Sequence, residues 1–184
     1  MFMTNAIQPS WQFPETMLPN DLRQWIEQHT LVRLVLAAVQ DGSVPSAHAA
    51  VLSDRNTDFR PHILLSLLTY CYATGIYSST DIELSFTRDT LVRHLCANTY
   101  PEAHRSRWFR RDNRQRIQRS LAEVFQRAWC IRYGLEESSP EAAAACFDQC
   151  LDPGVDRQDA LLFAVEAEER INRAVRLDCG AFDC

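Results

Sequence analysis

The sequence contains no lysine, so all nineteen of its basic side chains are arginines. An arginine offers a planar fork of donors that can bind a phosphate or a guanine edge through two hydrogen bonds, whereas a lysine offers a point charge. The 24 acidic residues outnumber the arginines and give a net charge of −5. Any cationic surface on this protein must therefore be local and made of guanidinium groups.

Long apolar runs are also missing, and even the leucine-rich stretch Ile63–Leu68 has a serine inside it. Because a helix needs about 20 mostly apolar residues to span a bilayer, the sequence predicts no membrane-spanning segment. The first residues, Met1–Asn5, show neither the basic nor the apolar stretch of a secretory signal. We therefore expect a soluble, cytoplasmic protein whose 184 residues form one core, with at most a small satellite.

Cysteine pairs of the Cys-x-x-Cys type do not occur among the seven cysteines. Cys71, Cys96 and Cys130 lie in apolar helical stretches, where a free cysteine packs as a small hydrophobic residue. The other four could be drawn together as a zinc site, but their spacings match no usual zinc knuckle. They are Cys146, Cys150, Cys179 and Cys184. We expect no metal and no cofactor.

Strand-like alternation and internal repeats are absent, whereas apolar residues recur at helical spacing along much of the chain. This pattern predicts an all-α fold. We expect a compact multi-helix domain with a helix-turn-helix-like arginine-rich element and a C-terminal helical extension. The expected parts are an extended N-terminal arm at 1–18, the helical domain at 19–134 and an acidic helical extension at 135–184.

The clearest helix is expected from Pro61 to Gly75, because proline favours a first helical turn and glycine favours the left-handed residue after a helix. It is apolar on nearly all sides, which predicts that it is buried at the centre. The remaining predicted helices lie over 22–41, over 43–52, after Ser78, after Thr87, over 142–150 and after Asp156.

The last predicted helix carries a narrow apolar stripe between charged faces. The stripe consists of Leu161, Leu162, Val165, Ile171 and Val175. It predicts either packing on the same core or a dimerisation seam. We favour packing on the core, because the stripe is too short for sustained heptads.

Positive charge is concentrated between Arg88 and Arg132. This window contains eleven arginines and four acidic residues, which gives it a net charge of +7. The segments before and after this window carry −4 and −8. A single helix through the densest part would place arginines on the side that its apolar second half buries, and burying unpaired charge is costly. We therefore expect two helices with a break at Asp112–Asn113, since these residue types are good N-caps and poor helix-interior residues.

The first of these two helices is expected to begin after Pro101 and to be anchored by Trp108 and Phe109, with its arginines facing outward; the second is expected to end at Gly134. A short helix of this kind has the properties of one that contacts phosphates or a DNA groove. The alternative is a charged face that only contacts solvent. The residues expected to contact DNA are Arg105, Arg107, Arg110, Arg111, Arg114 and Arg116.

Two segments resemble the N-terminal domain of bacterial insertion-sequence transposases of the DDE class. The first, Phe59–Glu83, has a proline-initiated leucine-rich helix, a tyrosine- and glycine-containing end, two serines, an isoleucine and an acidic residue. The second, Pro101–Arg111, is similar to the family's Pro-Asp-x-x-(Ser/Thr) segment leading to Phe-Arg, with the same order and spacing of the two blocks. The resemblance covers about residues 18–133.

The resemblance implies a helical domain that binds the DNA ends of a mobile element, normally followed by an RNase H-like domain whose carboxylates hold two metal ions. This chain departs from the family there, because no strand ending in Asp-Gly and a hydroxyl residue follows. Arg105-Ser106-Arg107 also stands where the family has a hydroxyl residue, which puts an inherited sequence preference in doubt. We expect no catalytic site and hence no enzyme.

Three functions follow as alternatives. The first is a stand-alone protein that binds double-stranded DNA, such as the terminal repeats of an element. The second is a protein-interaction or autoregulated module whose basic face docks an acidic partner or its own acidic C-terminal part. The third is the DNA-binding half of a split transposase with a separate catalytic subunit. A homodimer is compatible with each, and a hydrolase is disfavoured because no serine or cysteine has a recognisable nucleophile setting.

Overall fold

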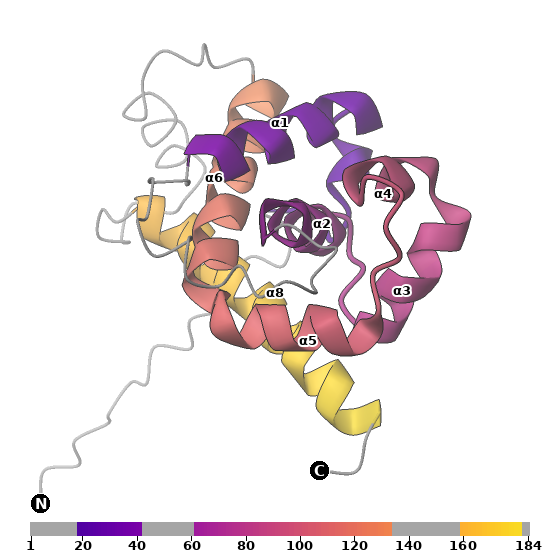
Figure 1. Ribbon diagram of the computed structural model, residues 1–184. Coiled ribbons are helices and arrows are strands. Elements are labelled where there is room, and N and C mark those ends of the chain that lie inside the picture. Colours follow the sequence, from indigo (N-terminus) through magenta and orange to yellow (C-terminus); the bar gives the residue numbers. More distant parts are fainter. Residues whose placement is uncertain (1–17, 42–60, 134–158, 182–184) are drawn as a thin grey trace, which may run out of the picture.

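Helix α2, Pro61–Ala73, runs through the middle of the computed structural model (Figure 1). Its ten residues from Leu64 to Ala73 are all buried, because the helix is apolar on nearly every side. The structure describes residues 18–41, 61–133 and 159–181. Within those ranges the regular elements are α-helices and one short 3₁₀ helix, so the predicted all-α fold and the central position of this helix are confirmed.

Six further α-helices surround α2 in the described part of the chain. α6 packs against α1, α2 and α8, while α3 packs against α4 and α5. Figure 1 shows α1 above α2, α6 to its left, α3 and α4 to its right and α5 below it. The bounds are α1, Gln28–Asp41; α3, Ser79–Arg88; α4, Thr90–Leu95; α5, Ala103–Asp112; α6, Arg114–Tyr133; and α8, Asp159–Ala181.

α8 packs on the same hydrophobic core as the other helices, which confirms the favoured interpretation of its apolar stripe. The composition of the stripe was predicted only in part. Its predicted member Val165 is 50% exposed, because it lies on the opposite side of the helix from the residues that reach the core. The buried apolar residues of α8 are Phe163, Ala167, Ile171 and Ala174.

The apolar pattern over 22–41 forms two helices rather than one. Asp21 caps the 3₁₀ helix η1, Leu22–Gln24, by accepting a hydrogen bond of 2.9 Å from the Arg23 amide. The chain then turns, and the indole of Trp25 packs edge-on against Trp129 of α6 with 5.9 Å between ring centroids. α1 begins only after this turn. The prediction of one continuous helix over 22–41 is therefore wrong.

The predicted break between two helices in the arginine-rich run is confirmed at Asn113. Its amide and its side-chain nitrogen both donate to the carbonyl of Phe109, at 2.9 and 3.2 Å, and so close the end of α5. The carbonyl of Asn113 accepts hydrogen bonds from the backbone amides of Arg116 and Ile117, and these bonds form the first turn of α6. One residue thus ends one helix and starts the next, which lets the chain change direction without an exposed loop. The predicted end of α6 before Gly134 is also confirmed.

The N-caps of α3 and α4 are Ser78 and Asp89. Ser78 caps α3, as expected, through its side-chain oxygen. Asp89 rather than Thr87 caps α4, so the prediction for Thr87 is wrong. The backbone of Asp89 is extended and its carboxylate accepts from the Leu91 amide at 2.8 Å. Thr87 lies inside α3, where its hydroxyl donates to a carbonyl of the preceding turn.

Ala97 ends α4 in the left-handed conformation that usually belongs to glycine, with φ of 48°. The amides of Ala97 and Asn98 donate to the carbonyls of His94 and Arg93, at 3.0 and 2.9 Å, which is the pattern of a Schellman motif. We expect Ala97→Gly to raise the free energy of unfolding by about 1 kcal/mol, because the steric cost of the left-handed residue exceeds the added entropy of glycine in the unfolded chain.

Urea denaturation measures this difference, with Ala37→Gly as the matched control. Ala37 lies inside α1, where the same substitution is expected to lower stability by about 1 kcal/mol. A loss of stability in both variants would contradict the assignment of the left-handed cap.

Several predicted features lie outside the described residues. They are the arm up to residue 17, the helices over 43–52 and 142–150, the Asp156 cap and three candidate zinc ligands, Cys146, Cys150 and Cys184. The predicted burial of Cys71, Cys96 and Cys130 is confirmed. Among the described residues, no group of three His, Cys, Asp or Glu side chains is placed to hold a metal ion. No helix in these ranges is long and apolar enough to cross a membrane.

Candidate nucleic-acid interface

The orientation of α5 differs from the one expected from its sequence. Ser106 and Arg110 are buried, whereas Trp108 is 63% exposed. With about 100° of rotation per residue, Ser106 and Arg110 share one side of the helix and Trp108 lies opposite. Phe109 is partly buried against the core, so half of the expected aromatic anchor is confirmed. The prediction that Trp108 anchors α5 is wrong, because the inward side of α5 meets polar groups.

Arg110 is the centre of a buried polar network that joins α5 to α2, α3 and α8. Only 4% of the residue is exposed, and its guanidinium forms an ion pair with Asp178 and donates to the Tyr72 hydroxyl at 3.0 Å. Asp178 also accepts from the amide and the hydroxyl of Ser79, at 2.8 and 2.5 Å. The expectation that Arg110 faces outward to contact DNA is therefore wrong, since a buried carboxylate from α8 already satisfies it.

Both charges of this network stay ionised despite their burial. Burial lowers the pKa of Arg110, but Tyr72 and Asp178 raise it by more, so the pKa lies above its usual value. Burial raises the pKa of Asp178, but hydrogen bonds from Ser79 and Arg110 outweigh this and hold the pKa below its usual value. Burial also raises the pKa of Tyr72 to about 12, which keeps its hydroxyl protonated. The network is therefore a fixed ion pair at neutral pH.

The lowered pKa of Asp178 makes part of the stability depend on acidity. The stabilisation is fully present above the unfolded-state pKa of about 3.9 and is lost as the pH falls through the lower folded-state pKa. We expect the free energy of unfolding of the wild type to fall more steeply between about pH 5 and pH 2 than that of Asp178→Asn. Urea titrations at several pH values measure the two slopes. Equal slopes would contradict the assignment.

Arg114, in the first turn of α6, is also used inside the protein. Its guanidinium binds Glu168 of α8, with 2.9 Å between Nε and Oε1, and donates to the side-chain oxygen of Asn172. About a third of the Arg114 and Glu168 side chains is exposed, so this pair lies at the rim of the α6–α8 contact. The prediction that Arg114 points outward to contact DNA is thus wrong in part, because its guanidinium binds Glu168 and Asn172 of α8.

Three of the remaining arginines, Arg111, Arg116 and Arg119, are exposed around the junction of α5 and α6, and Arg105 is half-buried nearer the start of α5. Arg111 is 71% exposed and pairs with the neighbouring Asp112 at 3.1 Å, and Arg105 pairs with Glu102 at 3.0 Å. Arg116 and Arg119 are exposed on α6. We call these four arginines, Arg105, Arg111, Arg116 and Arg119, the α5–α6 corner.

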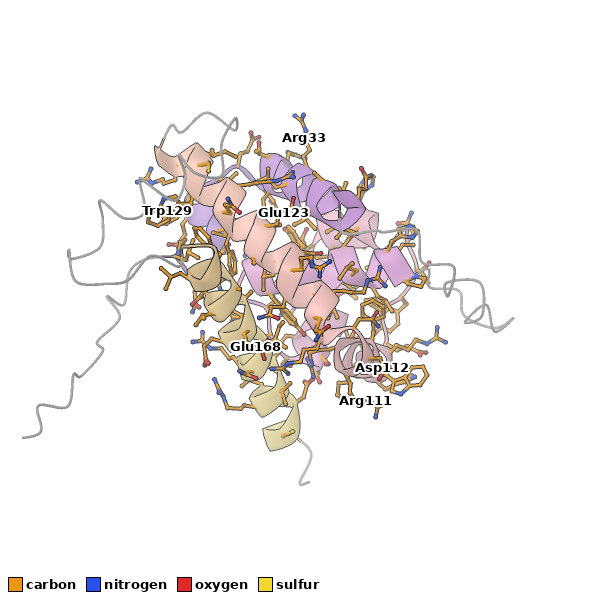
Figure 2. All side chains as sticks on the ribbon, turned by 90° about the vertical axis from the view of Figure 1, so that its left-hand side faces the viewer. Arg33, Arg111, Asp112, Glu123, Trp129 and Glu168 are labelled. Atoms are coloured by element: carbon orange, nitrogen blue, oxygen red, sulfur yellow. The ribbon has the colours of Figure 1, made fainter. Side chains whose placement is uncertain are left out.

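Arg119 is not among the arginines predicted to contact DNA, although it follows Arg116 by three residues and so neighbours it on the helix surface. Arg107 is half-buried on the flank of α5 and adds less to this surface. Figure 2 shows Arg111 and Asp112 together at the outer end of α5, on the opposite side of the molecule from Arg33 of α1.

The chemistry of the α5–α6 corner suits an anionic ligand. Exposed ion pairs such as Arg111–Asp112 contribute little, about 0–1 kcal/mol, so their guanidiniums can exchange a carboxylate for a phosphate at low cost. The two helices also present their cations on rigid backbone rather than on loops. This surface retains three of the six arginines expected to contact DNA, Arg105, Arg111 and Arg116, with Arg119 in addition.

The two segments that resemble transposases lie in α2 and α3 and in α5, elements that pack together in the same core. Nothing in the described residues provides a group of carboxylates placed for metal-assisted strand transfer. The family assignment therefore stays a prediction. Comparisons with models of known protein families, with characterised proteins and with solved structures find no match for this chain.

Proposed function

We propose that this protein binds duplex DNA through the α5–α6 corner and has no catalytic activity of its own. The observation that carries the proposal is that Arg111, Arg116 and Arg119 are exposed on two consecutive helices. They belong to the window with a net charge of +7 in a chain that is otherwise acidic. The resemblance of the same region to a transposase N-terminal domain supports the same function.

The physical basis of binding is the release of counterions from the phosphate backbone. Each phosphate that a guanidinium neutralises steepens the dependence of log affinity on log salt by about 0.9. If the four arginines of the corner each contact one phosphate, the slope is about −3 to −4. Because such contacts carry no sequence information, they fix the position of the protein on DNA, and base contacts have to supply any specificity.

Salt titration of duplex binding by the double variant Arg111→Ala with Arg116→Ala tests the proposal. We expect about tenfold weaker binding at low salt and a slope reduced by about 2, since each lost phosphate contact removes about one unit. The matched control is Arg33→Ala with Arg88→Ala, which removes two exposed charges from α1 and α3. Equal binding by the two double variants, or no binding by the wild type, would reject the proposal.

A substitution of Arg110 is unsuitable as a test of DNA binding. Arg110 is buried and paired with Asp178, so its loss would change folding as well as any contact with DNA. The variants Arg111→Ala and Arg116→Ala change only exposed side chains, whose effect on stability is usually within about 0.5 kcal/mol. They therefore separate binding from folding.

A second candidate function is an autoregulated module, and the contacts of α8 support it. Glu168 and Asp178 of α8 bind Arg114 and Arg110, so an acidic helix does dock on part of the basic region. α8 also contributes Phe163 and Ile171 to the core, and removing it would expose that core. Glu168→Gln is the sharper test, because it weakens the rim pair and leaves the core intact. Autoregulation predicts tighter DNA binding by this variant, and unchanged binding contradicts it.

A further inference from the structure

Trp108 is the most exposed large hydrophobic residue among the described residues, with 63% of its surface accessible. A tryptophan side chain can bury roughly 150–250 Å², so most of its potential stabilisation is left unused in the folded chain. A single exposed apolar residue is common and means little alone. The residues next to Trp108 on α5 are the further evidence that it belongs to a binding site.

Arginine residues lie on both sides of Trp108 along α5. Arg105 precedes it by three residues and Arg111 follows it by three, so both lie next to it on the helix surface. Their Cα atoms are about 9 Å apart along the helix axis, at 1.5 Å per residue. Their present partners, Glu102 and Asp112, are both about half-exposed, and such pairs exchange readily. The exposed indole thus lies on a helix surface whose neighbouring positions carry Arg105 and Arg111.

An aromatic ring flanked by cations is the combination with which proteins bind unpaired nucleotides. Bases stack on the ring, and the flanking cations bind the backbone phosphates. In a fully paired duplex both faces of every internal base are covered by its neighbours, so a surface indole can reach only a terminal or unstacked base. The charge of the corner favours this polyanion over an apolar protein partner.

We infer that Trp108 stacks on an unpaired base while Arg105 and Arg111 bind the flanking phosphates, so that the α5–α6 corner prefers DNA with single-stranded ends to blunt duplex. This inference rests on the proposed function and adds the part of the DNA that is recognised. Base stacking contributes about 1–3 kcal/mol per base, which corresponds to roughly 5- to 150-fold in affinity.

The test compares one duplex in two forms, blunt and with a short oligothymidylate overhang, by fluorescence anisotropy. We expect the wild type to bind the overhang form about tenfold more tightly. We expect Trp108→Ala to bind both forms as the wild type binds the blunt one, and Trp108→Phe to keep most of the preference. Because Trp108 is exposed, the urea midpoint of Trp108→Ala should match that of the wild type, which separates stacking from folding.

The outcomes distinguish this inference from the function on which it rests. If the wild type binds both forms equally, or Trp108→Ala keeps the preference, the inference fails while duplex binding through the arginines stands. If the wild type binds neither form, both fail. Loss of the overhang preference in Trp108→Ala, with blunt-duplex binding unchanged, supports the inference specifically.

Discussion

Replacing Arg110 with alanine is expected to lower the free energy of unfolding by about 3–5 kcal/mol. Asp178 would remain buried at 6% exposure without its counterion, and the hydroxyl of Tyr72 would lose its donor. The amide and hydroxyl of Ser79 would still bind the carboxylate, but they carry no charge to neutralise it. Urea denaturation monitored by circular dichroism measures the change.

Arg111→Ala is the matched control, because it removes the same charge from the next residue of the same helix. Arg111 is 71% exposed and pairs with its exposed neighbour Asp112, so we expect a change within about 0.5 kcal/mol. The contrast tests the orientation of α5 directly. Similar losses in the two variants would show that Arg110 and Arg111 do not differ in burial and would overturn the assignment.

Replacing Arg170 with alanine is expected to destabilise the protein by about 3 kcal/mol or more. The residue is 2% exposed, and its guanidinium donates to the carbonyls of Tyr72, Asn20 and Pro19 at 3.0, 3.1 and 2.7 Å. It also lies over the Phe125 ring, 4.5 Å from the centroid. These contacts tie α8 to the end of α2 and to the segment before η1.

The position of Arg170 at the end of α2 gives its charge a further role. The last carbonyls of a helix have no intrahelical partner and form the negative end of the helix dipole, which a buried cation stabilises. Lysine could not replace it fully, because one ammonium cannot reach three carbonyls in the geometry of the planar fork. We therefore expect Arg170→Lys to be destabilised as well, though less than Arg170→Ala.

Arg176→Ala serves as the control on the same helix. Arg176 is 63% exposed and pairs with Glu169 at 2.6 Å, so its loss should change the free energy of unfolding by less than about 0.5 kcal/mol. A loss of stability in Arg176→Ala comparable to that in Arg170→Ala would indicate a general effect of charge on α8 rather than the specific contacts of Arg170.

The role of α8 illustrates how a charge pattern can be only partly interpreted from sequence. The acidic C-terminal part and the basic central window suggested that the two dock, and Arg114 does bind Glu168. No local pattern indicated that Asp178 and Arg170 would be buried. Charged residues are seldom fully buried, and their burial depends on partners that arrive from elsewhere in the chain.

Local sequence determined the helical class of this protein and most of its helix ends. Pro61, Ser78 and Asn113 act through their own backbone conformation and neighbouring amides, so their effects can be predicted without knowing the fold. Tertiary structure alone decided which arginines remain available. Arg110 and Arg111 are adjacent in sequence, but about 100° of helix rotation turns one toward Asp178, 68 residues away in the chain, and the other toward solvent.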